Sequence, residues 1–270
     1  MPVVGVSGEC AVVPMALVSN IPTIEVRIDG RGPYQFAIDT GASGHGRIGT
    51  AVAEALKLKV VAEVRTPAPG GAVAMRSVFG APSIAVGGVS FTDVHLVAAS
   101  TVRGPTPPWD GILGIGMFHD RTLTIDYANG FVRIDRTPVR NGVSASFEDG
   151  IPTLPVQVAG RTFNVDLDTG NGASPLFLKE ADARALPIEG TPIERGRAKT
   201  SFGEFSIMEA ALGAPIMIGG YELPMRTVGW PTPRGDGNIG SRALKGTVLQ
   251  VDQTGGKVAV GAPGPALRCT

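Results

Sequence analysis

A chain of 270 residues can bury one large hydrophobic core or two smaller ones, and 43% hydrophobic with 18% charged residues excludes a disordered protein. Its 24 basic and 24 acidic residues cancel to zero formal charge, so neither nucleic acid nor an anionic membrane is predicted as a partner. The 38 glycines and 22 prolines interrupt many short runs rich in Val, Ile and Thr. This pattern is typical of short strands joined by turns, and we expect an all-β protein.

The first residues contain one of the two cysteines and no targeting pattern. A basic region followed by an apolar one, as in a signal peptide, is not seen there. The apolar residues 10–24 are interrupted by Pro14 and Pro22, and no membrane span is predicted. Cys10 and Cys269 are either inert core residues or a disulfide that joins the ends of the chain. A disulfide would favour a periplasmic or secreted protein, and free thiols a cytoplasmic one.

Two copies of one pattern make up the chain. IPTIEVRIDGRGPYQFAIDTGAS begins at Ile21 and IPTLPVQVAGRTFNVDLDTGNGAS at Ile151, an offset of 130 positions (151 − 21). Two later pairs recur in the same order, SIAVGGVSF with PIMIGGYEL, and DGILGIGMFHDRTLTID with DGNIGSRALKGTVLQVD. Such a repeat indicates two homologous halves. We predict an N-terminal lobe of residues 1–138 and a C-terminal lobe of residues 139–270, each with one D-T-G triplet.

In each half, an apolar hairpin leads directly into the D-T-G triplet. Apolar residues alternate with polar ones in residues 24–28, and the next apolar run ends at Asp39. Residues 154–158 and the run that ends at Asp168 repeat this arrangement. A short amphipathic helix is predicted after each triplet, at residues 50–57 and around residues 176–185. The rest of each half is predicted to be strands and glycine-rich turns.

Asp39 and Asp168 are the candidate catalytic residues. Asp-x-Gly is a common turn composition, so a single D-T-G could be only a turn. Two copies, each at the end of an apolar strand and each at the matching place of a duplicated half, are not explained by turn statistics.

Each triplet is also followed by an apolar-apolar-Gly element or a close variant of it. These elements are residues 112–114, within WDGILGIG, and residues 238–240, which read N-I-G. With D-T-G twice, the chain resembles the aspartic protease superfamily of pepsin-like and retropepsin-like enzymes over nearly its whole length. In length and in its D-T-G-A wording it is similar to a single-chain, fused retropepsin of the bacterial type. The resemblance implies a bilobal acid-protease fold, with two pseudo-symmetric β-barrel-like lobes and a few short helices.

The resemblance further implies an aspartic endopeptidase that cleaves peptide bonds without a cofactor or metal. Two facing carboxylates cannot both ionise easily, so the pair holds one proton, and one Asp acts as base while the other acts as acid. The substrate is expected to be a peptide or protein bound in extended form. A monomer is expected, because both half-sites lie in one chain.

Six neighbouring residues are expected to support the dyad, namely Thr40, Gly41, Ala42, Thr169, Gly170 and Asn171. Ala42 stands where pepsins usually have Ser or Thr, so one hydroxyl donor to a carboxylate is missing and we expect an activity optimum less acidic than pepsin's. Asn171 either replaces the missing donor or marks a weakened second site. Asn171 and Asn238 therefore leave a second interpretation open, a catalytically weak or inactive protease-like protein that binds peptides.

A cleft of this kind needs a cover that excludes water. Candidate flap residues are Gly70 and Gly71 in the first half and Ser201, Phe202 and Gly203 at the matching place of the second. Both segments could instead be plain surface hairpins, and the flap tyrosine of pepsins is not found. Trp109 and Trp230 precede the two later D-G segments. They could line substrate pockets, although packing in the core is the usual role of a large aromatic residue.

Other chemistries have weaker support in the sequence. Residues 44–49 match the dinucleotide pattern G-x-G-x-x-G, but five residues separate the first glycine from the strand, and no succession of βαβ units follows. The histidines are scattered, His45 is expected to be an exposed turn residue, and no zinc-ligand set is seen. No G-x-S-x-G segment for a serine nucleophile occurs.

Overall fold

The structure, a computed structural model, describes residues 3–67, 73–99, 109–148, 150–173, 175–200, 203–232 and 235–269. In these ranges β-strands dominate, which confirms the expected all-β class. The helices are short: α1 (Thr50–Ala55), a 3-10 helix (Ile115–Phe118), α2 (Glu180–Arg184) and α3 (Ser241–Leu244). Among the residues described, none of the helices has the length and hydrophobicity to cross a bilayer.

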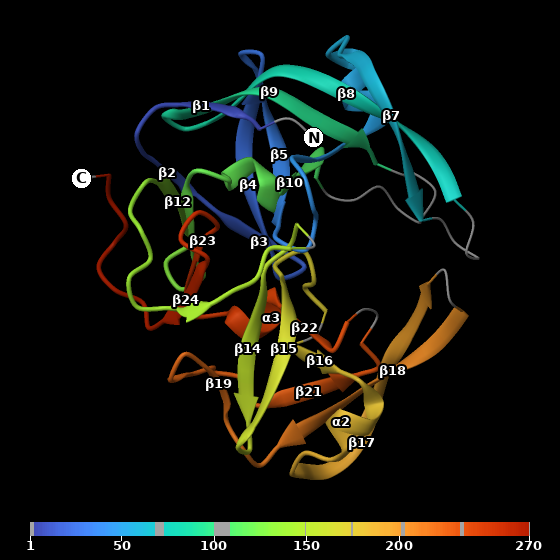
Figure 1. Ribbon diagram of the computed structural model, residues 1–270. Helices are drawn as coiled ribbons and strands as arrows, with labels where there is room; N and C mark the ends of the chain where they lie inside the picture. The colour runs from blue at the N-terminus through green and yellow to red at the C-terminus, as the bar shows by residue number, and fades with distance from the viewer. Residues whose placement is uncertain are drawn as a thin grey trace.

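The first half forms one mixed sheet, drawn at the top of Figure 1, in the order β1-β9-β6-β10-β5-β4-β8-β7, with β3 paired to β4. Its central pair, β5 and β10, is parallel, whereas β4 and β5 form an antiparallel hairpin. The strands are β1 (Gly5–Ser7), β3 (Ala16–Val18), β4 (Ile21–Ile28), β5 (Arg31–Asp39), β6 (Gly46–Ile48), β7 (Lys59–Pro67), β8 (Val73–Val86), β9 (Val89–Ala98) and β10 (Gly111–Gly114).

The second half forms a sheet of the same design, in the order β17-β18-β21-β16-β22-β15-β14-β19-β20, at the bottom of Figure 1. Here β15 and β22 are the parallel pair, and β14 and β15 the hairpin. The strands are β14 (Thr153–Val158), β15 (Arg161–Asp168), β16 (Leu176–Leu178), β17 (Ile188–Thr200), β18 (Gly203–Leu212), β19 (Ile216–Ile218), β20 (Tyr221–Glu222), β21 (Thr227–Trp230) and β22 (Gly237–Gly240).

A third sheet takes strands from both halves and connects them. Its order is β13-β24-β23-β11-β12-β2, and the antiparallel pairing of β11 with β23 is the junction between the halves. Residue 138, the predicted lobe boundary, lies between β12 and β13. The strands are β2 (Ala11–Pro14), β11 (Thr122–Asp126), β12 (Phe131–Asp135), β13 (Val143–Ser144), β23 (Val248–Asp252) and β24 (Lys257–Gly261).

Alternation along the hairpin strands explains why the two sheets form where they do. In β4, Ile24, Val26 and Ile28 are buried, while Glu25 and Arg27 between them are exposed. β14 repeats this pattern with Leu154, Val156 and Val158 buried. Successive side chains of a strand point to opposite faces, so each hairpin turns one apolar face to the core and leaves the other polar.

The predicted helix around residues 176–185 is wrong in its first part. Leu176–Leu178 form the buried strand β16, which pairs with β21 and β22, and α2 begins only at Glu180. A short apolar run has no helical or strand period of its own, so its partners in the sheet decide its conformation. The first predicted helix lies at residues 50–55 rather than 50–57.

Cys10 and Cys269 form a disulfide with their Cα atoms 5.7 Å apart. The sequence left this pairing open against two free thiols. The bond closes a loop across 259 positions and ties the segment before β2 to the end of the chain. The disulfide thereby holds the last described residues next to the start of β2, a strand of the shared third sheet.

Candidate active site

The first predicted catalytic residue, Asp39, is the last residue of β5. Parallel pairing sets it opposite Gly114 of β10. The Ala42 N–H donates to the Asp39 carbonyl at 3.1 Å, and the Gly114 N–H donates to the His45 carbonyl at 3.0 Å. Two strands and a tight turn therefore hold the backbone of Asp39.

Asp168, the second predicted catalytic residue, has the same surroundings in the other half. It ends β15 and lies opposite Gly240 of β22. The Asn171 N–H donates to the Asp168 carbonyl at 3.0 Å, and the Gly240 N–H donates to the Pro175 carbonyl at 3.0 Å. The duplicated sequence thus builds the same strand-and-turn support twice.

Thr40 and Thr169, both fully buried, connect the two turns through four reciprocal hydrogen bonds. Each hydroxyl accepts the backbone N–H of the other threonine at 3.0 Å. Each hydroxyl also donates, Thr40 to the Leu167 carbonyl and Thr169 to the Ile38 carbonyl, both at 2.7 Å. Every polar atom in this contact is satisfied, so the two turns are fixed to one another as one unit.

Gly41 and Gly170 let the two aspartates meet. A Cβ atom on Gly41 would lie 2.5 Å from Cγ of Asp168, and one on Gly170 would lie 2.3 Å from Cγ of Asp39. Each carboxyl group therefore lies against the glycine of the opposite half, where no side chain fits. The two carboxyl groups are also close enough for the charge of Asp168 to raise the pKa of Asp39. The structure brings the two carboxyl groups into contact across the junction of the halves.

This contact strongly changes the acidity of Asp39. Burial, the negative charge of Asp168 and the hydrogen bond to Asp168 together raise the pKa of Asp39 from 3.8 to about 7. The charge of Arg47 and a backbone hydrogen bond from Gly41 act in the opposite direction and are outweighed. Two adjacent carboxyl groups resist double ionisation, so Asp39 keeps its proton to a higher pH than an isolated aspartate does. The largest cause is burial, whereas the sequence had suggested a missing donor at Ala42.

The two asparagines that depart from the family pattern lie together at Asp168. Asn238 Nδ2 donates to Asp168 Oδ2 at 3.0 Å. Asn171 does not reach the carboxylate in this arrangement; its Nδ2 donates to Asn238 Oδ1 at 2.8 Å. The donor to Asp168 is therefore Asn238, although the sequence pointed to Asn171. The strand register identifies Asn238 as this donor, because Asn238 lies opposite Asp166, two residues before Asp168.

Sheet register identifies further residues on the face of each sheet that carries the aspartate. In the first half, Ile112 lies opposite Ala37 and Arg47. In the second half, Asn238 lies opposite Asp166 and Phe177. Residues directly opposite in a sheet share a face with each other and with residues two positions along. Arg47 is exposed on this face and was not singled out in the sequence.

The predicted flap residues fall mostly outside the described ranges. Gly70, Gly71, Ser201 and Phe202 lie there, and Gly203 begins β18. The described strands on either side form two long hairpins, β7 with β8 and β17 with β18, which extend along the same side of the molecule in Figure 1. Equivalent hairpins thus occur in both halves.

Three other residues from the sequence occupy different environments. Trp109 is half-buried just before β10, and Trp230 is buried at the end of β21 with the Arg184 guanidinium 5.2 Å from its ring centre. His45 was expected to be exposed, and this is wrong: it is 3% exposed, and its Nδ1 accepts the His95 backbone N–H at 2.9 Å. A histidine that follows a turn can still be drawn into the core when a neighbouring strand offers a donor.

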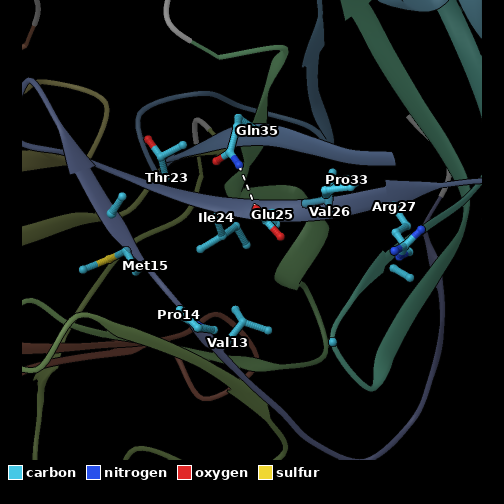
Figure 2. Close-up of a pocket in the computed structure, with 13 residues that line it drawn as sticks. Val13, Pro14, Met15, Thr23, Ile24, Glu25, Val26, Arg27, Pro33 and Gln35 are labelled. Atoms are coloured by element: carbon cyan, nitrogen blue, oxygen red, sulfur yellow. Dashed lines mark hydrogen bonds between the residues drawn. The ribbon is translucent and has the colours of Figure 1, made fainter. Parts of the chain in front are cut away.

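The surface has two hollows with a volume of about 570 Å³ each. One is next to the second D-T-G turn and is lined by residues 19–21, residues 170–173 and Arg242. The other, shown in Figure 2, is lined mainly by residues 13–16 and 23–27, with the Gln35 amide donating to Glu25 at 3.3 Å. Neither Asp39 nor Asp168 lines the hollow in Figure 2.

No group of His, Cys, Asp or Glu within the described ranges is arranged to hold a metal ion. Residues 44–49, which match the dinucleotide pattern, contain the whole of strand β6, and α1 begins at the next residue, Thr50. The first half is a sheet of mostly antiparallel pairs, and the glycines pack against β10. A Cβ atom on Gly46 would lie 2.0 Å from the Ile112 carbonyl oxygen. These glycines therefore serve close backbone packing.

Residues 24–117 match the family model described as aspartyl protease. The matched range is 94 residues long (117 − 24 + 1) and includes the first D-T-G triplet and β10. No curated protein matches the chain. The family match supports the aspartic protease superfamily, which the sequence also resembles.

Proposed function

We propose that the protein is an aspartic endopeptidase, with Asp39 and Asp168 as its catalytic dyad. The observation that carries this proposal is the reciprocal contact of the two turns. The threonine hydrogen bonds and the two glycines set one carboxyl group of each half against the other. Two like-charged groups in contact destabilise a fold, whereas two carboxyl groups that share one proton provide an acid and a base side by side.

The proposed reaction is attack of a water molecule on a peptide carbonyl. The ionised carboxylate takes a proton from the water while the protonated one gives its proton to the carbonyl oxygen, which forms a tetrahedral diol. The carboxyl group that took the water proton then gives it to the leaving nitrogen, while the other carboxylate takes a proton from a hydroxyl of the diol; the C–N bond breaks, and an amine and a carboxylic acid are released. One shared proton is enough for both steps, because each aspartate reverses its role between them. The group that accepts a proton in the first step donates one in the second.

We infer a fused retropepsin-like arrangement, with lobes at residues 1–138 and 139–270 and a monomer as the working unit. Two equivalent hairpins, β7–β8 and β17–β18, support a cleft covered from both lobes. Main-chain groups at the edges of such hairpins suit a peptide in extended conformation. The disulfide between Cys10 and Cys269 favours a periplasmic or secreted location, since such bonds persist in oxidising compartments.

The test is cleavage of a denatured protein between pH 3 and pH 8, with Asp39→Ala and Asp168→Ala as the decisive variants. Each is expected to lower the rate by at least about 100-fold, the usual contribution of a general acid or base. Asp182→Ala is the matched control, because Asp182 only forms a surface ion pair with Arg161 and should leave the rate unchanged. A statine-type inhibitor should block the wild-type activity.

Equal turnover by both dyad variants and the wild type would remove the proposal. Binding of peptides by the wild type without turnover at any pH would instead favour a protease-like peptide-binding protein. The hydrogen bond from Asn238 to Asp168 is the observation that favours this second candidate, because it changes the surroundings of one carboxylate of the pair.

A further inference from the structure

A chain of hydrogen bonds leads from the backbone of the second D-T-G turn to one oxygen of the dyad. The Ala173 N–H donates to Asn171 Oδ1 at 3.2 Å. Asn171 Nδ2 then donates to Asn238 Oδ1 at 2.8 Å, and Asn238 Nδ2 donates to Asp168 Oδ2 at 3.0 Å. The three bonds are in series, and each of the two amide groups uses its oxygen on one side and its nitrogen on the other.

The direction of this chain follows from its first member. A backbone N–H can only donate, so Asn171 must turn its oxygen toward Ala173 and its nitrogen toward Asn238. Asn238 must then present its oxygen to Asn171 and its NH₂ group to Asp168. Asp168 Oδ2 is consequently an acceptor. A proton on this oxygen would meet the hydrogen of the amide, so the chain favours a bare oxygen at this position.

The first half offers Asp39 no such donor. Ala42 occupies the place of Asn171, and Ile112 occupies the place of Asn238 in the register with the strand that ends at the aspartate. Both side chains are apolar. Asp39 Oδ1 is buried and has no hydrogen-bond partner among the described residues. An uncompensated buried oxygen disfavours the ionised form.

Charged and titratable groups near the pair do not reverse this difference. Arg47 of β6 favours ionised Asp39, but burial and the charge of Asp168 outweigh it. Burial raises the pKa of Tyr127, so it is neutral, and its hydroxyl pairs with Ser241 Oγ at 2.8 Å. Asp166 accepts from Thr153 on the same face as Asp168. Arg242 behind the second turn pairs with Glu209 at 2.8 Å.

We propose that Asn238, oriented by Asn171, is a positioning residue that places the single proton of the dyad on Asp39 and keeps Asp168 as the ionised partner. The proposed location of the proton does not depend on whether the protein is an active enzyme. If the protein is the peptidase proposed above, Asp168 is the base that activates the water and Asp39 is the acid that protonates the carbonyl oxygen.

The location of the proton is tested by carboxyl NMR on the full chain with ¹³Cγ-labelled aspartate. The Asp39 resonance is assigned by its loss in Asp39→Asn, and the Asp168 resonance by its loss in Asp168→Asn. Both resonances sense both steps of a coupled pair. Of the two titration steps, the upper one lies near pH 7. In that step we expect the larger chemical-shift change in the Asp39 resonance. A larger chemical-shift change in the Asp168 resonance at that step would overturn the proposal, whether or not the protein cleaves peptides.

The role of the asparagines is tested by giving the second half the residues of the first. Asn238→Ile removes the donor to Asp168 Oδ2, and Asn171→Ala removes the group that orients it. We expect the lower NMR step, and the low-pH limb of any peptidase activity, to move up by roughly one pH unit in Asn238→Ile and by less in Asn171→Ala. The upper step should change less than the lower one.

Asn164→Ile is the matched control, because Asn164 is exposed on β15, four positions before Asp168, and should leave both steps in place. Identical titrations of Asn238→Ile, Asn164→Ile and the wild type would show that the amide has no influence on the dyad. If Asn238→Ile does not fold, the wild-type titration and Asn171→Ala still decide. A wild type without turnover at any pH would contradict the proposed peptidase and leave the NMR result valid.

Discussion

The two halves of the molecule are alike in the backbone around their aspartates and unlike in the side chains. Both have a parallel strand pair that ends at D-T-G, a threonine that reaches across, and a glycine that receives the opposite carboxyl group. On the face of the sheet that carries the aspartate, however, Ile112 and Arg47 of the first half correspond to Asn238 and Phe177 of the second.

This difference separates two requirements of one site. Placing two carboxyl groups in contact needs matching backbones, because any shift of one turn would break the hydrogen bonds of the other. Dividing the roles of acid and base needs different surroundings for the two groups. In the proposed enzyme, the shared backbone meets the first requirement, and the differing side chains meet the second.

The largest effect is expected where the halves touch. Gly170→Ala and Gly41→Ala would each put a Cβ within 2.5 Å or less of the opposite Cγ atom, so one carboxyl group must move. A displacement of about 1 Å in a catalytic group costs on the order of 100-fold in rate, and we expect at least this loss in a peptide-cleavage assay. Gly261→Ala, where a Cβ meets no atom within 4 Å, is the control. Full activity of both variants would show that the contact is dispensable.

The threonine contact should contribute equally from both sides. Thr40→Val and Thr169→Val each leave one buried N–H and one buried carbonyl without a partner, and each should lower the free energy of unfolding by about 2–5 kcal/mol. Urea denaturation measures this loss. Thr162→Val, at an exposed position of β15, should cost little. Clearly unequal losses would mean that the two halves do not share the contact symmetrically.

The raised pKa of Asp39 makes stability depend on pH. Between the unfolded value of 3.8 and the folded value of about 7, the folded state binds more protons than the unfolded state, so stability falls as pH rises through this range. Asp39→Asn removes this loss. The variant should match the wild type below pH 4 and exceed it at pH 8 by at most about 4 kcal/mol, the full value of such a shift.

Thermal or urea unfolding at both pH values provides the measurement. Asp182→Asn, at a surface ion pair, serves as control and should change the free energy of unfolding by less than about 1 kcal/mol at either pH. A constant difference for Asp39→Asn between pH 4 and pH 8 would show that Asp39 titrates normally.

The smallest effect is expected from Arg47, which corresponds to the uncharged Phe177 of the second half. Its positive charge lowers the pKa of Asp39 against the effect of burial. Arg47→Met should therefore move the high-pH limb of activity upward, by less than about one pH unit because Arg47 is exposed. The shift should shrink at high salt, and Arg27→Met, at an exposed position of β4, should give none. A shift in the opposite direction would contradict the assigned sign.

Local patterns carried much of the prediction. Alternation identified the hairpins before each triplet, since an exposed and a buried face leave a period of two in the sequence. Residues 176–178 were misassigned because a fully buried strand has no such period. His45 was misplaced because its burial depends on His95, fifty positions away in the chain.

The sequence by itself determined the all-β class, the duplication and the two D-T-G turns, because each leaves a repeated local pattern. Tertiary structure decided that Cys10 pairs with Cys269, and that Asn238 rather than Asn171 donates to Asp168. It also decided that burial is the main cause of the raised pKa of Asp39. These properties depend on which distant residues meet and how much water they exclude, and neither quantity has a period that a sequence can display.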